Sequence, residues 1–147
     1  MIRGRYRYAA RLMVDYFKTE LPHVWPCTKI PKDRQAPPCS GRPVVLISSV
    51  QAGGPPVGPH GSNLVLAWRR LIFQVIGDDE EQAADVCEEV RSAVVRARYA
   101  HVIRGTSILG EPGRLDVPDE PVPRFQTTID VLLREHYPRQ AAIAGNG

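Results

Sequence analysis

The distribution of proline constrains this chain more than any other sequence feature. Twelve of the 14 prolines lie in, or at the edges of, three stretches, 26–42, 51–63 and 110–123. Proline fixes its own φ angle and lacks an N–H donor, so it interrupts helices and central strands. The three stretches are therefore predicted to be long loops, and regular structure is expected in the segments between them.

Two of the intervening segments have the apolar periodicity of amphipathic helices. In residues 5–21 the apolar side chains recur at spacings of three and four, and Pro22 ends the segment; they are Tyr6, Ala10, Met13, Phe17 and Leu21. Residues 79–99 show the same spacing at Ala83, Val86, Cys87, Val90, Val94 and Ala97. Asp78 or Asp79 is a suitable N-cap for this second helix.

Four segments are predicted to be strands, at 43–50, 64–76, 101–109 and 124–134. They are rich in β-branched and apolar residues, and the second and fourth alternate. The alternation places Leu71, Phe73 and Val75 on one face, as it does Phe125, Thr127, Ile129, Val131 and Leu133. The order α-β-β-α-β-β predicts an α+β fold with a mixed or antiparallel four-stranded sheet and both helices packed on one face. A single domain is expected over 1–147, with its core at about 5–135 and a flexible tail at 138–147.

Composition argues against several classes of protein. Hydrophobic residues make up 43% of the chain and charged residues 24%, as in globular proteins. No apolar run approaches the ~18–20 residues of a spanning helix, and no apolar segment of a signal peptide follows the basic N-terminus. We therefore expect a protein that folds in a cytoplasm and does not enter a membrane.

The cysteines and the polar loops suggest neither a metal nor a catalytic site. Three cysteines make a disulfide framework improbable, and the spacing of His23, Cys27 and Cys39 matches no zinc template. The segment 53–62 resembles a phosphate-binding loop in its glycines, but its prolines remove N–H donors and no lysine follows. No Gly-x-Ser-x-Gly motif is present, and the acidic residues of 116–120 lack the spacing of a calcium loop. We expect no cofactor, no metal and no enzymatic activity.

Charge is distributed unevenly along the chain. Residues 1–42 carry nine Lys and Arg against three Asp and Glu, a net charge of +6, whereas residues 43–147 carry ten against thirteen, a net charge of −3. Arg3, Arg7 and Arg11 are four residues apart and would share one helix face. Such a face can bind phosphates, or it can pair with an acidic surface on a neighbouring subunit.

The order of these segments resembles a known family of viral proteins. The chain runs from YRYAARLMVDYFKTELP through PVVLISSVQAGG and DDEEQAADVCEEVRSAVV to the strand that begins at Pro123–Gln126. This order is similar to that of the tail terminators, or tail completion proteins, of siphophages that infect actinobacteria. The resemblance covers about residues 5–135, and its most specific parts are Val50–Gly54 and Pro123–Gln126.

The resemblance implies a fold like that of the lambda tail terminator and a structural role in the virion. Members form homo-hexameric rings that cap the tail tube, stop its polymerisation and offer a face to the neck of the capsid. The implied partners are further copies of the chain, the major tail tube protein and the neck or head-completion proteins, with DNA passing through the lumen. The implied location is the head–tail junction of a virion assembled in the host cytoplasm.

Two other functions remain open from the sequence. One is a neck or head–tail adaptor, and the other is a small nucleic-acid-binding module that uses the basic N-terminal region. For the ring, the interface is predicted to come from the basic region and the three loops. The candidate residues are Arg3, Arg7, Arg11, Gly53, Gly54, His60, Asp116, Asp119 and Arg124. Trp25 and Trp68 are expected to be packing residues.

Overall fold

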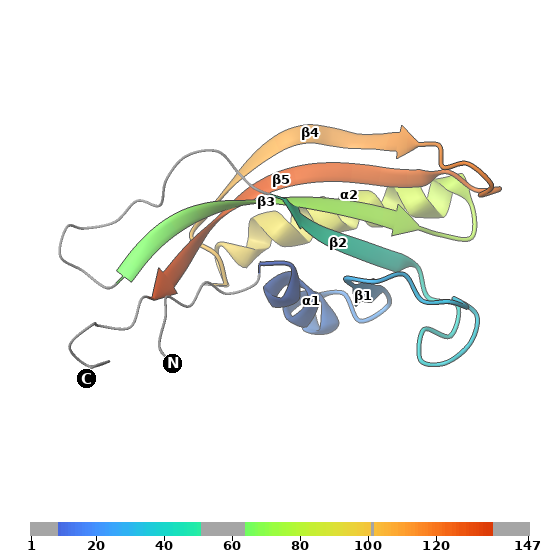
Figure 1. Cartoon of the computed structure of the whole chain (residues 1–147), viewed down its shortest axis with the longest axis horizontal. Helices are drawn as coiled ribbons and strands as arrows, with labels where there is room; N and C mark the ends of the chain where they lie inside the picture. Colours follow the sequence, from blue (N-terminus) through green and yellow to red (C-terminus); the bar gives the residue numbers. More distant parts are fainter. Residues whose placement is uncertain (1–8, 51–63, 101, 137–147) are drawn as a thin grey trace.

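The protein is an α+β structure in which two helices pack on a five-stranded mixed sheet (Figure 1). The computed structural model describes residues 9–50, 64–100 and 102–136. Its elements are, in chain order, α1 (Ala9–Glu20), β1 (Trp25–Cys27), β2 (Val44–Val50), β3 (Leu64–Ile76), α2 (Glu80–Ala97), β4 (Gly105–Leu115) and β5 (Arg124–His136).

The sheet has the strand order β1-β2-β3-β5-β4. Only β1 and β2 are parallel, and every other neighbouring pair is antiparallel. β3 and β5 are the longest strands and form its centre, pairing from Leu64 opposite His136 to Val75 opposite Phe125. β2 borders only the second half of β3, from Arg70 onward, so β3 and β5 extend beyond the other strands at one end.

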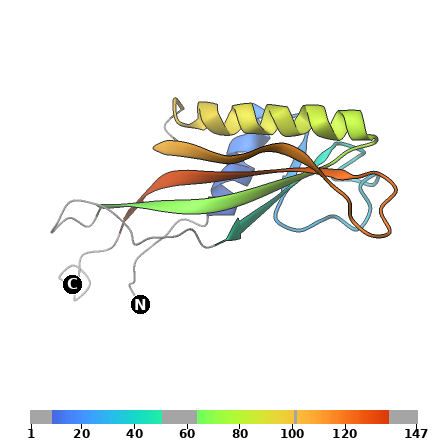
Figure 2. The same cartoon turned by 90° about the horizontal axis from the view of Figure 1, so that it is seen from above.

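One face of the sheet carries the hydrophobic core, and both helices cover it. Leu71, Phe73 and Val75 of β3 are fully buried, and β5 contributes its own alternating residues beside them. The ring of Phe17 in α1 lies 5.9 Å from that of Phe73, which brings α1 onto this face. Figure 2 shows α2 lying along the same sheet, and the Tyr16 hydroxyl of α1 donates to the Ala93 carbonyl of α2 at 2.8 Å.

The sequence predicts most of these elements. The expected alternation is confirmed on β3 and β5, where Thr127, Ile129, Val131 and Leu133 are buried. The six apolar residues expected to form the buried side of the second helix are all buried in α2. Asp79 is the N-cap, and its carboxylate accepts a hydrogen bond from the Gln82 N–H at 2.7 Å. Residues 5–8 of the first predicted helix lie outside the described residues, as do 51–63 and the predicted tail 138–147.

The expected four-stranded sheet is wrong because residues 25–27 form a fifth strand, β1. This strand contains Pro26, and the sequence reading places a loop there. β1 is a three-residue edge strand, and the Trp25 N–H donates to the Pro43 carbonyl at 2.8 Å. Proline is compatible with such a strand because an edge position need not donate to a second neighbour. The element order is therefore α-β-β-β-α-β-β.

The strand predicted at 101–109 is also placed wrongly. In the structure, the residues after α2 turn back, with the Val102 N–H bonded to the Ala97 carbonyl, and β4 begins at Gly105. It continues through Pro112 to Leu115, into the stretch predicted to be a loop. Register shifts near Gly110 and Gly113 interrupt its pairing with β5, and the buried Thr127 hydroxyl donates to the Gly110 carbonyl at 2.8 Å. An edge strand tolerates glycine, proline and bulges of this kind.

Candidate functional site: exposed interaction surfaces

Of the residues predicted to form an interface, the four that the structure describes do not come together in one place. Arg3, Arg7, Gly53, Gly54 and His60 lie outside the described residues. Arg11 is exposed on α1, whereas Asp116 and Asp119 belong to the connection between β4 and β5, and Arg124 is the first residue of β5. Three separate surfaces of the described residues have the composition of contact surfaces, and only one of them includes a predicted residue.

Arg124 is engaged within its own chain. Its Nε donates to the Glu120 carboxylate at 2.9 Å, its Nη1 donates to the Gln74 side chain at 2.8 Å, and Nη2 also bonds Glu120. The Arg124 side chain is only 12% exposed, and its hydrogen bond lowers the pKa of Glu120. Arg124 therefore positions the β4–β5 connection against the sheet and is not a free cation for a partner.

The two aspartates of the same connection are exposed. Asp119 has a φ of +68°, in the left-handed region, and supports the tight turn in which the Glu120 N–H bonds the Val117 carbonyl at 3.1 Å. Asp116 accepts a hydrogen bond from Arg114 at 3.1 Å, and Arg114 also pairs with Glu80 at the start of α2 at 3.4 Å. This corner of the molecule is held together by internal charge pairs.

The first surface is the outer face, defined as the face of the sheet opposite the helices and turned toward the viewer in Figure 1. Neither helix covers it. Apolar residues on it are exposed or partly exposed, and they are Leu46, Val50, Leu66, Trp68, Ile72, Ile76 and Leu132. Val50 is 39% exposed and Trp68 36% exposed. Trp68, expected to be a packing residue, thus keeps over a third of its surface open to solvent.

The charges on the outer face pair with one another across the strands. Arg70 of β3 donates to Asp130 of β5 through two nitrogens, at 2.9 and 3.2 Å. Gln74 donates to Gln126 at 2.9 Å and accepts from Arg124. Among its described side chains, the outer face therefore combines paired charges with apolar residues, which suits a protein partner better than a polyanion.

The second surface is the basic groove, a shallow groove between α1 and the segment that includes β1. Arg11 and Lys18 of α1 line one side and Lys29 the other, with Val14 and Trp25 between them. Ile30, beside Lys29, is 44% exposed. Within the described ranges no carboxylate pairs with Arg11, Lys18 or Lys29.

The third surface is the acidic groove, along the exposed side of α2. It is lined by Asp79, Glu81, Asp85 and Glu89, with His23 and Pro43 on its other side. Glu89 pairs with His23, whereas Glu81 and Asp85 have no cationic partner among the residues that the structure describes. Carboxylates at positions i, i+4 and i+8 repel one another on one helix face.

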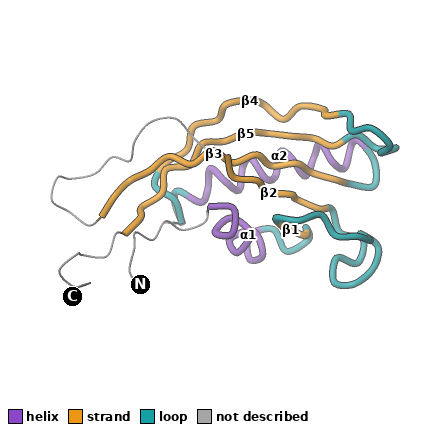
Figure 3. The backbone as a smooth tube through the Cα atoms, in the orientation of Figure 1, coloured by secondary structure: helices purple, strands orange, loops and turns teal. Residues whose placement is uncertain are grey.

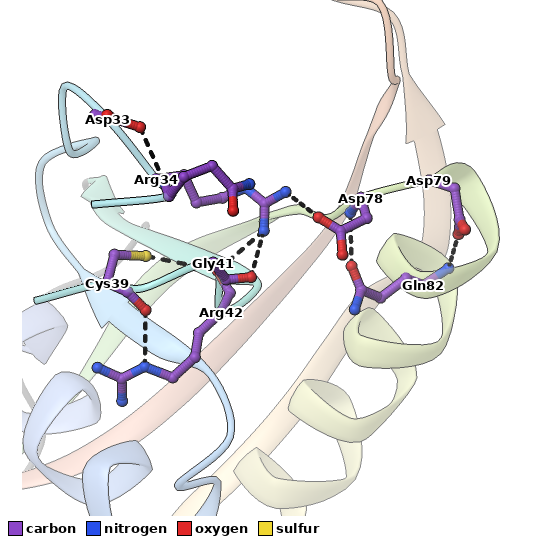
Figure 4. A network of polar contacts seen from close by, with 9 residues as sticks. Asp33, Arg34, Cys39, Gly41, Arg42, Asp78, Asp79 and Gln82 are labelled. Carbon is purple, nitrogen blue, oxygen red and sulfur yellow. Dashed lines mark hydrogen bonds and ion pairs between the residues drawn. The ribbon is translucent and has the colours of Figure 1, made fainter. Parts of the chain in front are cut away.

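The proline-rich segment 28–43 is fixed to the body of the molecule by two arginines (Figure 4). Arg34 donates to the Gly41 carbonyl at 2.8 Å and pairs with Asp78, just before α2. Arg42 donates to the Cys39 carbonyl at 3.0 Å, and its guanidinium lies 5.1 Å from the centre of the Trp25 ring. Figure 3 shows this segment at the same end of the sheet as the β4–β5 connection.

Catalytic chemistry has little support in the described residues. His23 and Glu89 form a half-exposed pair, and Ser92 lines a neighbouring groove, but within the described chain no hydrogen bond joins the Ser92 hydroxyl to His23. Burial raises the pKa of the Cys27 thiol to about 11 and that of Cys87 to about 12, which disfavours the thiolate. No three His, Cys, Asp or Glu residues of residues 9–50, 64–100 and 102–136 are grouped to share a metal ion.

Comparison with known proteins leaves these surfaces as the basis for assigning a function. The sequence matches no protein-family model and no curated protein. Among the described helices, none is both long and apolar enough to cross a lipid bilayer.

Proposed function

We propose that this chain is a structural protein of a phage tail, which forms a six-fold ring, caps the tail tube and joins it to the neck. The proposal combines the order of sequence segments, which resembles the tail terminators, with the surfaces of the domain. The observation that carries it is the outer face, where neither helix covers the central sheet and Trp68 and Val50 are exposed. Its partners are further copies of the chain, the tail tube protein and the neck.

The outer face supports an assembly role because it combines exposed apolar side chains with charges that are already paired. Soluble monomers rarely expose continuous apolar patches, and such patches mark contact surfaces. On this face Trp68 and Val50 remain exposed, while the charges between the apolar residues are already paired, as in Arg70 with Asp130. A protein surface can cover these side chains without leaving a buried charge unpaired. We assign the outer face to contact with the tail tube protein.

A nucleic-acid-binding role receives support from the basic groove, where Arg11, Lys18 and Lys29 are gathered. Three cations beside an apolar Trp25 and Ile30 are a small footprint for a duplex, and DNA affinity would fall steeply with salt. A salt titration with duplex DNA tests this second function. Binding that is tight at physiological salt would favour it over the ring.

The test of the proposed function is reconstitution with the tail tube protein of the same phage. Purified chain and tube protein are mixed, and negative-stain micrographs are scored for rings, for density at tube ends and for tube length. We expect rings at the tube ends and a narrow distribution of tube lengths. Binding to portal-bearing heads but not to tubes would indicate a neck adaptor instead. A chain that stays monomeric with tubes present would refute the terminator function.

A further inference from the structure

The basic and acidic grooves lie on surfaces that one copy of the chain cannot bring together. Tyr16 and Glu20 point from α1 toward α2, where they contact the Ala93 carbonyl and Arg96. Arg11 and Lys18 are seven residues apart, and together with Val14 they line the groove on the side of α1 next to β1. Helical spacing puts this side opposite Tyr16 and Glu20. The basic groove therefore points away from the acidic side of α2.

Each groove carries charges that the described part of its own chain does not neutralise. The basic groove has three such cations, and the acidic groove has Glu81 and Asp85 beside the paired Glu89. Like charges at i and i+4 cost a helix stability, and that cost is recovered if an opposite charge is supplied from outside. The grooves are complementary in sign and similar in their shallow form.

We propose that the basic groove of one copy docks onto the acidic groove of the next copy, with Arg11, Lys18 and Lys29 facing Glu81 and Asp85. This inference rests on the proposed function, because it assigns the contact between subunits of the ring. Two different surfaces that meet at a fixed rotation form a head-to-tail interface, which closes into a ring when the rotation divides a full turn. Ile30 and the exposed edge of Trp25 supply the apolar part of the contact.

The test uses charge reversal on the full-length chain. One variant carries Lys18→Glu and Lys29→Glu, so that both of its surfaces are acidic. The other carries Glu81→Lys and Asp85→Lys, so that these two carboxylates of its acidic groove become cations. All four side chains are exposed, and circular dichroism checks that the variants fold. A control with Arg98→Glu and Arg104→Glu makes the same change in net charge as the first variant, at the turn between α2 and β4.

We expect each variant alone to assemble at least about a hundredfold more weakly than the wild type, because like charges then meet across the interface. Mixing the two variants in equal amounts should restore rings, since the glutamates introduced in one variant then meet the lysines introduced in the other and the copies alternate around an even-numbered ring. The control should assemble as the wild type does, and added salt should weaken wild-type assembly.

Mass measurement and electron microscopy separate failure of the groove assignment from failure of the proposed function. Rings that form equally well from either variant alone would overturn the assignment of the grooves while leaving the ring itself in place. A wild-type chain that never assembles, with or without tail tubes, would instead refute the proposed function. Failure of the mixture to assemble, with both variants folded, would also overturn the assignment.

Discussion

Replacing Trp68 with alanine should weaken binding to the tail tube without abolishing the fold. The side chain is 36% exposed on the outer face. A tryptophan has about 250 Å² of surface, so a partner can cover about 90 Å² more, which corresponds to about 2 kcal/mol of binding free energy at ~25 cal/mol/Å². We therefore expect the dissociation constant for tube ends to rise about thirtyfold.

The same substitution also removes packing within the sheet, so stability must be measured beside binding. Trp68 lies against Gly105 at the start of β4, and the part already buried contributes at most about 4 kcal/mol. Val50→Lys provides a second variant, because Val50 is 39% exposed at the end of β2 and a lysine there adds charge to the patch without emptying a buried site. Tyr99→Ala is the control, since Tyr99 is 73% exposed just after α2.

The assay is co-sedimentation of the chain with preformed tail tubes, at a temperature where each variant is shown to be folded. Trp68→Ala and Val50→Lys should both lose affinity, and Tyr99→Ala should bind as the wild type does. Unchanged binding by both outer-face variants would refute the assignment of this face. An equal loss in all three would show that the effect is not specific to it.

Three further predictions concern the fold. Val90 is fully buried in α2, so Val90→Asp should cost several kcal/mol of stability and leave the domain largely unfolded by circular dichroism. Val90→Ala should cost only about 2 kcal/mol. A Val90→Asp variant that melts like the wild type would contradict the placement of α2. The hydrogen bond from Arg124 lowers the pKa of Glu120, so this pair stabilises the fold above the ordinary carboxyl pKa and loses its effect as the pH falls through the lowered value. Glu120→Gln should therefore lower the free energy of unfolding in urea by about 1 kcal/mol at neutral pH and converge with the wild type in acid. An equal difference at every pH would count against the pair. The thiol of Cys87, with a pKa of about 12, should react with iodoacetamide at pH 8 orders of magnitude more slowly in the folded chain than in urea, and rapid labelling of native protein would show that it is not buried.

Strict patterns in the sequence predict the centre of this fold well. β3 spans the predicted range 64–76, and α2 begins directly after Asp79, one of the two N-caps expected. Leu71, Phe73 and Val75 of β3 and the apolar stripe of α2 are buried, so this burial pattern is visible in the residues themselves. Prediction fails at the sheet edges, where Pro26 in β1 and Pro112 in β4 interrupt the pattern, because an edge strand has one partner and tolerates what a central strand does not.

The candidate surfaces are less visible in the sequence than the core. The row of Glu81, Asp85 and Glu89 has a spacing of four that can be seen in the residues, but acids in the first half of a helix are also favoured by the helix dipole, so the spacing alone does not indicate a contact surface. Lys29 is 11 residues from Lys18, and only the return of the chain into β1 places the two beside the same groove. Arg124, predicted to face a partner, instead bonds Glu120 and Gln74. Contacts of this kind depend on tertiary structure, which no local pattern contains.

The most direct test of the account is the mass and symmetry of the particle that the chain forms with the tail tube protein of its phage. Mass photometry and electron microscopy of the mixture measure both. We predict a ring of six copies seated at the tube end, with tubes that no longer grow once the ring is bound. A chain that remains monomeric beside freely growing tubes would contradict the account.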